Sequence, residues 1–307
     1  MRIDQPKRVL VAGATGYLGR FAVQAFKQAG HHVRVLTRDE PRLHEGGPFT
    51  SPALSDADLD EVFVGQVTKP ETLQGLMADI DLVFSCVGIS RQRDGLTFDE
   101  VDYQGNQNLI DLARDAGVRR FVYVAMEGAE QIRHLAITQV HEKVVDALKN
   151  SGLEYRVVRP CGYFSDMGAL YDMAKNGRGY LVGAGSNRMS PIHGRDLARV
   201  CVEAAEGEEI EVVAGGPDEM TQREALELAF DVVGKPAKIT VVPIWLARIV
   251  VWLIGLLSKQ YRDLADFIVT AGEIDGVGPP VGTTSLRSYF EELRDADLRK
   301  DRSTNAA

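Results

Sequence analysis

The stretch that decides the fold is Val9-Leu10-Val11-Ala12-Gly13-Ala14-Thr15-Gly16-Tyr17-Leu18-Gly19, an apolar run followed by three spaced glycines. The run from Val9 to Ala12 predicts a strand that is covered on both faces. Apolar residues then recur at helical spacing from Leu18 to Ala29, and Gly30 stands where a helix stop is expected. The stretch therefore predicts a strand, a tight turn and a helix.

The three glycines have separate expected roles. Gly13 makes the tight turn, Gly16 lets the backbone approach a pyrophosphate, and Gly19 lets the helix pack close to the strand. Free N–H groups at the helix start would bind the phosphates. Because a further strand, 32–37, follows the helix, we predict dinucleotide binding rather than a turn that only packs. The expected binding residues in this loop are Gly13, Thr15, Gly16, Tyr17, Leu18 and Gly19.

Composition and charge limit the classes of protein to which the chain can belong. A chain of 307 residues with 45% hydrophobic content can bury the core of one large domain or two. The charged start, Met1 to Arg8, shows no signal-peptide core, so we expect a cytoplasmic protein. The three cysteines form no Cys-x-x-Cys pair, and no metal site is expected. A net charge of -9 argues against a nucleic-acid partner.

The residues after the second strand bear on the choice of cofactor. An arginine can pair with the 2′-phosphate of NADP, whereas an acidic side chain accepts from the 2′-hydroxyl of NAD. Arg38 therefore favours NADP(H). NAD(H) remains the alternative, with Asp39 or Glu40 as the ribose ligand, and Arg38 would then be a solvated surface charge.

The rest of the first half alternates between strands and helices. This alternation predicts a Rossmann-type doubly wound parallel sheet in an NAD(P)-binding domain over residues 1–158. Gly88 falls where the strand order should reverse, so Cys86, Val87 and Gly88 are expected along the nicotinamide half of the cofactor. The further strands are expected at Glu61–Val67, Asp81–Gly88, Phe121–Ala125 and Tyr155–Arg159.

The pattern changes from Pro160 onward. We expect residues 159–291 to form a smaller α+β substrate lobe, with a strand near 210–214 returning to the main sheet. The polar tail, 292–307, is expected to fray. Capping boxes predict helix starts at Thr68-x-x-Glu71 and Thr221-x-x-Glu224, and residues 41–60 read as an irregular, mobile connection.

Several motifs together resemble the atypical extended short-chain dehydrogenase/reductases over about residues 7–291. They are the glycine loop, Val101-Asp102-Tyr103-Gln104-Gly105-Asn106, Val158-Arg159-Pro160 and Pro191-Ile192-His193-Gly194-Arg195-Asp196-Leu197-Ala198. The chain looks closest to the NmrA-like and divinyl-chlorophyllide-reductase-like branches, the second through Ser85-Cys86-Val87, Phe164-Ser165-Asp166-Met167, Gly215-Gly216-Pro217 and Val242-Pro243.

The resemblance implies NAD(P)H binding in the glycine loop. It further implies cofactor contacts at Val67 and Pro160. In the family a Gly-Asp-Val follows the third strand and its acid contacts adenine, whereas this chain has Gly65-Gln66-Val67. Gln66 therefore takes the place of the acid, and its amide could bond the base edge.

The same resemblance implies a catalytic Ser or Thr after the fifth strand and a Tyr-x-x-x-Lys on the next helix. Here Ala125-Met126 occupies the serine region, Ile137 the tyrosine position and His141 the lysine position. Carbonyl or alcohol chemistry driven by tyrosine is therefore not expected. Some atypical members that lack the tyrosine reduce conjugated carbon–carbon double bonds, for which a hydride and a proton from another donor suffice.

Two residues are candidate proton donors. His141 comes first, because imidazole titrates near neutrality and this position would face the nicotinamide ribose. His141 could equally be a surface or ribose-bonding histidine, and Tyr163, the second candidate, could simply pack.

We expect an NAD(P)H-dependent oxidoreductase that reduces a small hydrophobic, conjugated substrate. The alternative is a non-catalytic NADP-binding redox sensor, regulator or assembly factor, and an epimerase or dehydratase ranks last.

Residues 241–257 are unusually apolar but fall short of the roughly 20 residues that a spanning helix needs. Pro243 and Arg248 shorten the usable run further. We expect a buried or dimer-interface helix first, a lid over an apolar substrate second, and contact with a membrane surface third.

Overall fold

The computed structural model describes residues 6–88 and 95–305. Contacts divide the chain into two compact units. The first takes in residues up to Ala129, then Ala136–Pro160 and Gly194–Val213. The second comprises Glu130–Leu135, Cys161–His193 and the chain from Ala214 onward.

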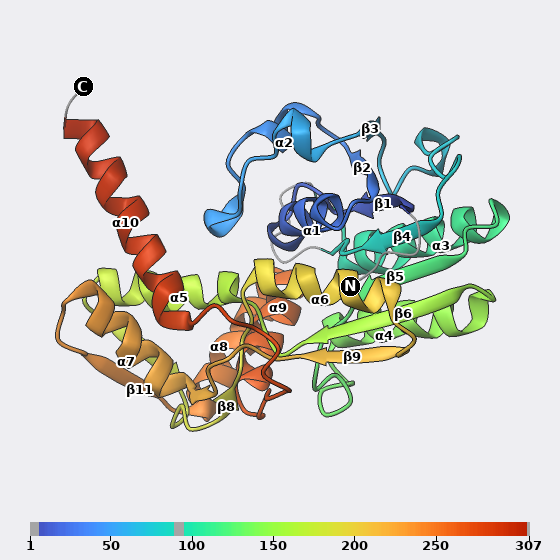
Figure 1. Ribbon diagram of the computed structural model, residues 1–307. Helices are drawn as coiled ribbons and strands as arrows, with labels where there is room; N and C mark the ends of the chain where they lie inside the picture. Colours follow the sequence, from blue (N-terminus) through green and yellow to red (C-terminus); the bar gives the residue numbers. More distant parts are fainter. Residues whose placement is uncertain (1–5, 89–94, 306–307) are drawn as a thin grey trace. The chain divides into compact units, whose positions relative to one another are not determined.

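The first unit is built on a seven-stranded sheet in the order β3-β2-β1-β4-β5-β6-β9 (Figure 1). The pairings from β3 to β6 are all parallel, and the order reverses between β1 and β4. This is the doubly wound Rossmann fold that the sequence predicted. The strands are β1 (Arg8–Ala12), β2 (His32–Thr37), β3 (Glu61–Val64), β4 (Leu82–Ser85), β5 (Arg120–Val124), β6 (Glu154–Pro160) and β9 (Glu211–Ala214).

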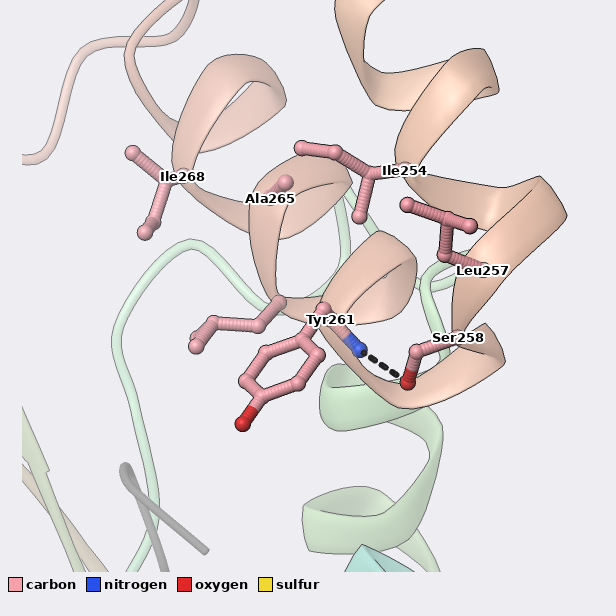
Figure 2. A pocket seen from close by; sticks show the side chains of 7 residues that line it. Ile254, Leu257, Ser258, Tyr261, Ala265 and Ile268 are labelled. Carbon is pink, nitrogen blue, oxygen red and sulfur yellow. Dashed lines mark hydrogen bonds between the residues drawn. The ribbon is translucent and has the colours of Figure 1, made fainter.

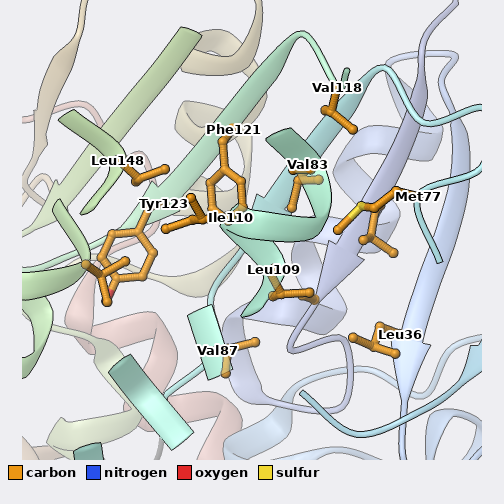
Figure 3. Packing of buried hydrophobic residues seen from close by; sticks show 14 of the residues in the cluster. Leu36, Met77, Val83, Val87, Leu109, Ile110, Val118, Phe121, Tyr123 and Leu148 are labelled. Carbon is orange, nitrogen blue, oxygen red and sulfur yellow. The ribbon is translucent and has the colours of Figure 1, made fainter. Parts of the chain in front are cut away.

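Helices cover the sheet. Every residue of β1 from Val9 to Ala12 is completely buried, as expected for a strand between two helical layers. In one layer, Leu109 and Ile110 of α3 and Leu148 of α4 pack against the sheet (Figure 3). Each such side chain contributes about 1.5–3 kcal/mol through burial. The helices of this unit are α1 (Tyr17–Gln28), α2 (Pro41–His44), a π-helical turn (Asp99–Gln104), α3 (Gly105–Asp115), α4 (Ala136–Ser151) and α6 (Gly194–Glu206).

Two local expectations in this unit were wrong. Residues 41–60 are not wholly irregular, because they contain α2 and the 3-10 turns Pro48–Thr50 and Asp56–Asp58. The capping box at Thr68 does not form either. Its 3-10 turn starts at Pro70, and the Thr68 hydroxyl instead accepts a hydrogen bond from Gln66 Nε2 at 2.8 Å.

The second unit has a core of aromatic and aliphatic side chains where α5, α7 and α10 meet. Phe164, Tyr171, Phe230 and Phe290 are all buried in it. The predicted capping box of α7 is confirmed, since Thr221 and Glu224 bond each other reciprocally. The elements are α5 (Phe164–Lys175), β7 (Gly179–Val182), β8 (Arg188–Met189), β10 (Met220–Thr221), α7 (Gln222–Val233), β11 (Ile239–Val242), α8 (Ile244–Leu257), α9 (Lys259–Ala271) and α10 (Leu286–Asn305).

The tail that was expected to fray is helical, and α10 continues to Asn305. Its first turns bury Tyr289 and Phe290, which anchor the helix. Further along, Asp297 accepts hydrogen bonds from Tyr171 Oη at 3.0 Å and Lys175 Nζ at 2.6 Å. These contacts supply the tertiary stabilisation that a polar sequence does not reveal.

Of the expected buried or dimer-interface helix over residues 241–257, the buried alternative was wrong, and the dimer-interface alternative stays a prediction. Of the residues in α8, only Ala247 and Val251 are buried. Within residues 6–88 and 95–305, no helix is long and apolar enough to cross a membrane.

Candidate functional site

The turn between β1 and α1 requires its glycines. Gly13 has a φ of +95°, which side chains rarely allow, and its carbonyl accepts a hydrogen bond from Gly16 N at 3.0 Å. A Cβ on Gly19 would lie 2.0 Å from Gly13 O. The first turn of α1 therefore packs directly on the backbone of the loop.

This helix start fits a phosphate group. Gly16 caps α1 in an extended conformation without a side chain, and the first turn carries no acidic residue. The first N–H groups of a helix lack partners within the helix and carry partial positive charge, so they suit an anion. Of the residues in this turn, Leu18 and Gly19 are buried, which leaves the loop backbone as the binding surface.

A buried polar network fixes the loop after β4. Ser85 Oγ donates to Asn106 Oδ1 at 2.5 Å, and Asn106 Nδ2 donates to Val87 O at 3.1 Å and Asp102 O at 2.6 Å. Sequence reasoning did not assign Asn106 a role, although it closes the Val101–Asn106 motif. The network holds the segment that precedes Gly88 against the π-helical turn.

Cys86 lies directly against the glycine turn. Its backbone N–H donates to Ala12 O at 3.1 Å, and its sulfur lies 2.9 Å from the Cβ position of Gly13. Burial raises the pKa of the Cys86 thiol to about 12. This cysteine therefore stays a protonated packing residue at neutral pH.

Gly88, Asp102 and His141 come together beyond β4 and β5. The Cβ position of Gly88 is 3.5 Å from Asp102 Oδ2 and 3.9 Å from His141 Cε1. His141 Nδ1 forms a 2.7 Å hydrogen bond with Tyr123 Oη, and its Nε2 lies 3.9 Å from Asp102 Oδ2. About 16% of the His141 side chain remains exposed, so one edge of the ring is accessible.

Burial lowers the pKa of His141 to about 4; the charge of Glu142 raises this pKa by a smaller amount, and that of Arg159 lowers it further. The expectation that this imidazole titrates near neutrality was therefore wrong. At pH 7 the ring is neutral, which makes it a hydrogen-bonding group and a poor proton source.

This low pKa predicts a pH dependence of stability. The pKa of His141 is about 4 in the folded chain and 6.5 in the unfolded chain. The stability that comes from keeping this ring neutral is therefore complete above pH 6.5 and is lost as the pH falls to 4. The loss is on the order of 3 kcal/mol. Urea unfolding at pH 7 and 4.5 should show a smaller acid-induced loss in His141→Gln than in the unsubstituted chain. Equal losses would contradict the assignment.

Arg38 lies on an exposed turn at the end of β2. Thr37 Oγ1 shapes this turn, because it accepts from Asp39 N at 3.1 Å and donates to Asp39 O at 2.9 Å. Both Arg38 and Asp39 are exposed. Which of them binds the ribose stays a prediction.

Arg20 of α1 organises the neighbouring loop, and sequence reasoning missed it. The side chain is buried and donates hydrogen bonds to five backbone carbonyls, those of Thr15, Arg42, Leu43, Glu45 and Pro52. A single arginine among polar residues gives no sequence signal for such a role. Its effect is to tie residues 42–52 to the helix that follows the glycine turn.

The remaining predicted contacts have local roles of their own. Gln66 Nε2 donates to Thr68, Val67 O accepts from Asn108 Nδ2 at 2.8 Å, and Pro160 O accepts from Glu127 N at 3.1 Å. Their contacts with a cofactor stay predictions. Tyr163 caps α5 in the second unit, so its predicted place beside the cofactor is not tested.

A family model described as NAD(P)H-binding matches residues 13–208, which is more than half of the chain. The chain belongs to this NAD(P)H-binding family. The matched region begins at the glycine turn and includes β4, β5, His141 and α6. The predicted cofactor class is therefore confirmed.

Relatives of this NAD(P)H-binding chain include two kinds of protein. It is 28% identical to the chloroplastic divinyl chlorophyllide a 8-vinyl-reductase of Zea mays over 291 residues, covering 91% of this chain and 71% of the relative. It is 27% identical to the photosystem II assembly factor Ycf39 of Trieres chinensis over 261 residues, covering 81% and 76%. These relatives confirm the resemblance to the atypical short-chain dehydrogenase/reductases of the NmrA-like group.

Solved structures support the fold. The NADPH complex of a quinone oxidoreductase from Escherichia coli superposes with a TM-score of 0.74 at 18% identity, covering 93% of this chain and 99% of that one. The NADP(H) complex of a Citrobacter sp. triphenylmethane reductase gives a TM-score of 0.71 at 19% identity, covering 92% and 99%. At these identities the likeness shows a shared fold.

Proposed function

We propose that this protein is an NADPH-dependent reductase of a hydrophobic, conjugated small molecule. The observation that carries the proposal is the pairing of an intact glycine turn with a neutral His141 in place of the usual lysine. Ile137, in the tyrosine position, has no acidic group. The described site thus suits a reaction in which hydride transfer is the demanding step.

The chain's own residues would bind and orient the cofactor. NADPH, when bound, supplies a hydride. The backbone of Gly13–Gly19 would hold its phosphates, and Gly88 follows β4 where the strand order reverses, so the nicotinamide half would pass beside it. When Tyr123 Oη donates to Nδ1, the neutral His141 carries its proton on Nε2, where it can bond a ribose hydroxyl. His141 would therefore be a positioning residue.

A conjugated substrate fits this arrangement. Hydride addition to a conjugated double bond leaves a negative charge that is spread over the π system. Such an anion can take its proton from water, so a strong acid beside the substrate is unnecessary. The relative from Zea mays is named as a vinyl reductase, which supports this substrate class. The contribution of the second unit, including Tyr163, to substrate binding stays a prediction.

Replacing Arg38 with alanine should lower the affinity for NADPH roughly tenfold or more while leaving that for NADH nearly unchanged. The reason is that only the 2′-phosphate offers the guanidinium a charged partner. Titration of each variant with both cofactors measures the effect. Arg114→Ala, on the exposed side of α3, is the matched control. Equal losses for NADPH and NADH would assign Arg38 another role.

The reaction class is tested by following NADPH oxidation with a panel of hydrophobic substrates. Conjugated alkenes and extended π systems should be consumed, whereas simple ketones should not, because the site lacks the tyrosine that protonates a carbonyl oxygen. Ketone reduction without alkene reduction would overturn the proposal.

A non-catalytic role is the second candidate. The loss of the Ser-Tyr-Lys set supports it equally, and a relative that is 27% identical is named as a photosystem II assembly factor. Such a protein would bind NADPH with the same glycine turn but would not turn it over. Cofactor binding alone therefore does not separate the two candidates, whereas hydride transfer does.

A further inference from the structure

The helical hairpin formed by α8 and α9 carries a broad apolar face. Ala247 and Val251 pack inward against Val182, Val242 and α9, and Ser258 joins the two helices. Six of the large exposed side chains of α8 fall, at 100° per residue, within a sector of about 140°. We call these six the apolar face: Trp245 (65% exposed), Ile249, Trp252, Leu253, Leu256 (65%) and Leu257 (91%).

The apolar face continues into a groove between the two helices. Figure 2 shows Ile254 and Leu257 of α8 opposite Tyr261, Ala265 and Ile268 of α9, around an open volume of about 380 Å³. The six side chains of the face are between 45% and 91% exposed and are continuous with the groove, which makes an apolar patch of the kind that marks an interaction site. Surface of this size and chemistry calls for an apolar partner.

The polarity of the face indicates which partner. Its only side-chain hydrogen-bonding groups are the indole N–H groups of Trp245 and Trp252. A protein interface carries about one hydrogen bond per 100–200 Å², which this face could not supply, whereas lipid chains need none. Arg248, the one charged residue of α8, is held by Glu273 at 2.6 Å.

We propose that the apolar face of α8 binds the surface of a lipid bilayer, with the helix lying in the interface. A helix of 14 residues is about 21 Å long and cannot cross the roughly 30 Å hydrocarbon layer. Tryptophan and tyrosine favour the headgroup boundary, where Trp245, Trp252 and Tyr261 would lie. The groove beside Leu257 would accept part of an acyl chain.

Charge predicts what kind of lipid is needed. From 244 to 271 the hairpin has three basic and two acidic residues, in a chain whose net charge is -9. Attraction to anionic headgroups is therefore weak, and burial of the apolar face supplies the binding free energy. Neutral vesicles should suffice, and added salt should change binding little.

The full-length protein can be tested with phosphatidylcholine vesicles and its own fluorescence. Both tryptophans of the chain lie on α8, so the emission reports on this face alone. We expect vesicles to shift the emission to shorter wavelength and a quencher attached to the acyl chains to reduce it. The double variant Leu256→Asp/Leu257→Asp should bind vesicles at least roughly tenfold more weakly.

Leu298→Asp is the control, since it makes one of these Leu→Asp changes at an exposed position of α10 and should leave vesicle binding unchanged. If the double variant is unfolded, quenching of the unsubstituted protein by the lipid quencher still decides the matter. A short-wavelength shift that needs no lipid and grows with protein concentration would assign the face to a second copy and overturn the proposal. Lack of quenching and of vesicle binding would also overturn it.

Discussion

Replacing Gly19 with alanine is expected to weaken NADPH binding severely. The added Cβ would lie 2.0 Å from Gly13 O and 2.6 Å from Gly13 C, and both are backbone atoms that cannot rotate away. The start of α1 must then move off the glycine turn, which misplaces the N–H groups that face the phosphates. We expect the affinity to fall by roughly 100-fold or more in a calorimetric titration.

Gly46→Ala is the matched control for this substitution. A Cβ there meets no atom within 4 Å, so NADPH binding and stability should not change. Thermal unfolding of both variants separates a lost site from a lost fold. Folded Gly19→Ala that binds NADPH as tightly as the unsubstituted chain would show that the phosphates lie elsewhere.

Replacing Arg20 with methionine should destabilise the first unit by about 3–5 kcal/mol. The side chain is buried and donates to five carbonyls, among them Leu43 O at 3.1 Å, Glu45 O at 2.6 Å and Pro52 O at 2.9 Å. Methionine keeps the packing but leaves these acceptors without donors. Urea unfolding measures the loss, and hydrogen exchange should rise first over residues 42–52.

Two further variants sharpen this test. Arg20→Lys should lose nearly as much, because an ammonium group cannot reach five carbonyls in the way that a guanidinium does. Arg199→Ala, on the exposed side of α6, should change the free energy of unfolding by less than about 0.5 kcal/mol. Unchanged stability of Arg20→Met would refute the role of Arg20 in holding this loop.

The fold could be predicted because its signals are local. The apolar run of β1, the glycine turn and the helical spacing of α1 lie within about 20 residues, and each pattern has one favoured geometry. The return of β9 to the sheet was also anticipated and is confirmed. The prediction that the polar tail frays failed, because α10 is stabilised by tertiary contacts such as the burial of Tyr289.

The site could be predicted only in part, for a similar reason. The sequence pattern identified His141 as a candidate, but its pKa depends on burial and on the charge of Arg159, which is distant in sequence. The Ser85–Asn106 and Arg20–Leu43 hydrogen bonds link residues that are 21 and 23 positions apart, and single polar residues give no periodic signal. The apolar sequence of α8 was evident, but its exposure was not.

Transfer of deuterium from NADPH labelled at its transferable position tests the central claim most directly. The purified protein is incubated with the labelled cofactor and a mixture of cell metabolites, and the products are searched by mass spectrometry for added deuterium. We predict label in one hydrophobic, conjugated compound, with the second hydrogen coming from water. If NADPH binds in the same sample but no compound acquires label, the reductase proposal is wrong and the non-catalytic role takes its place.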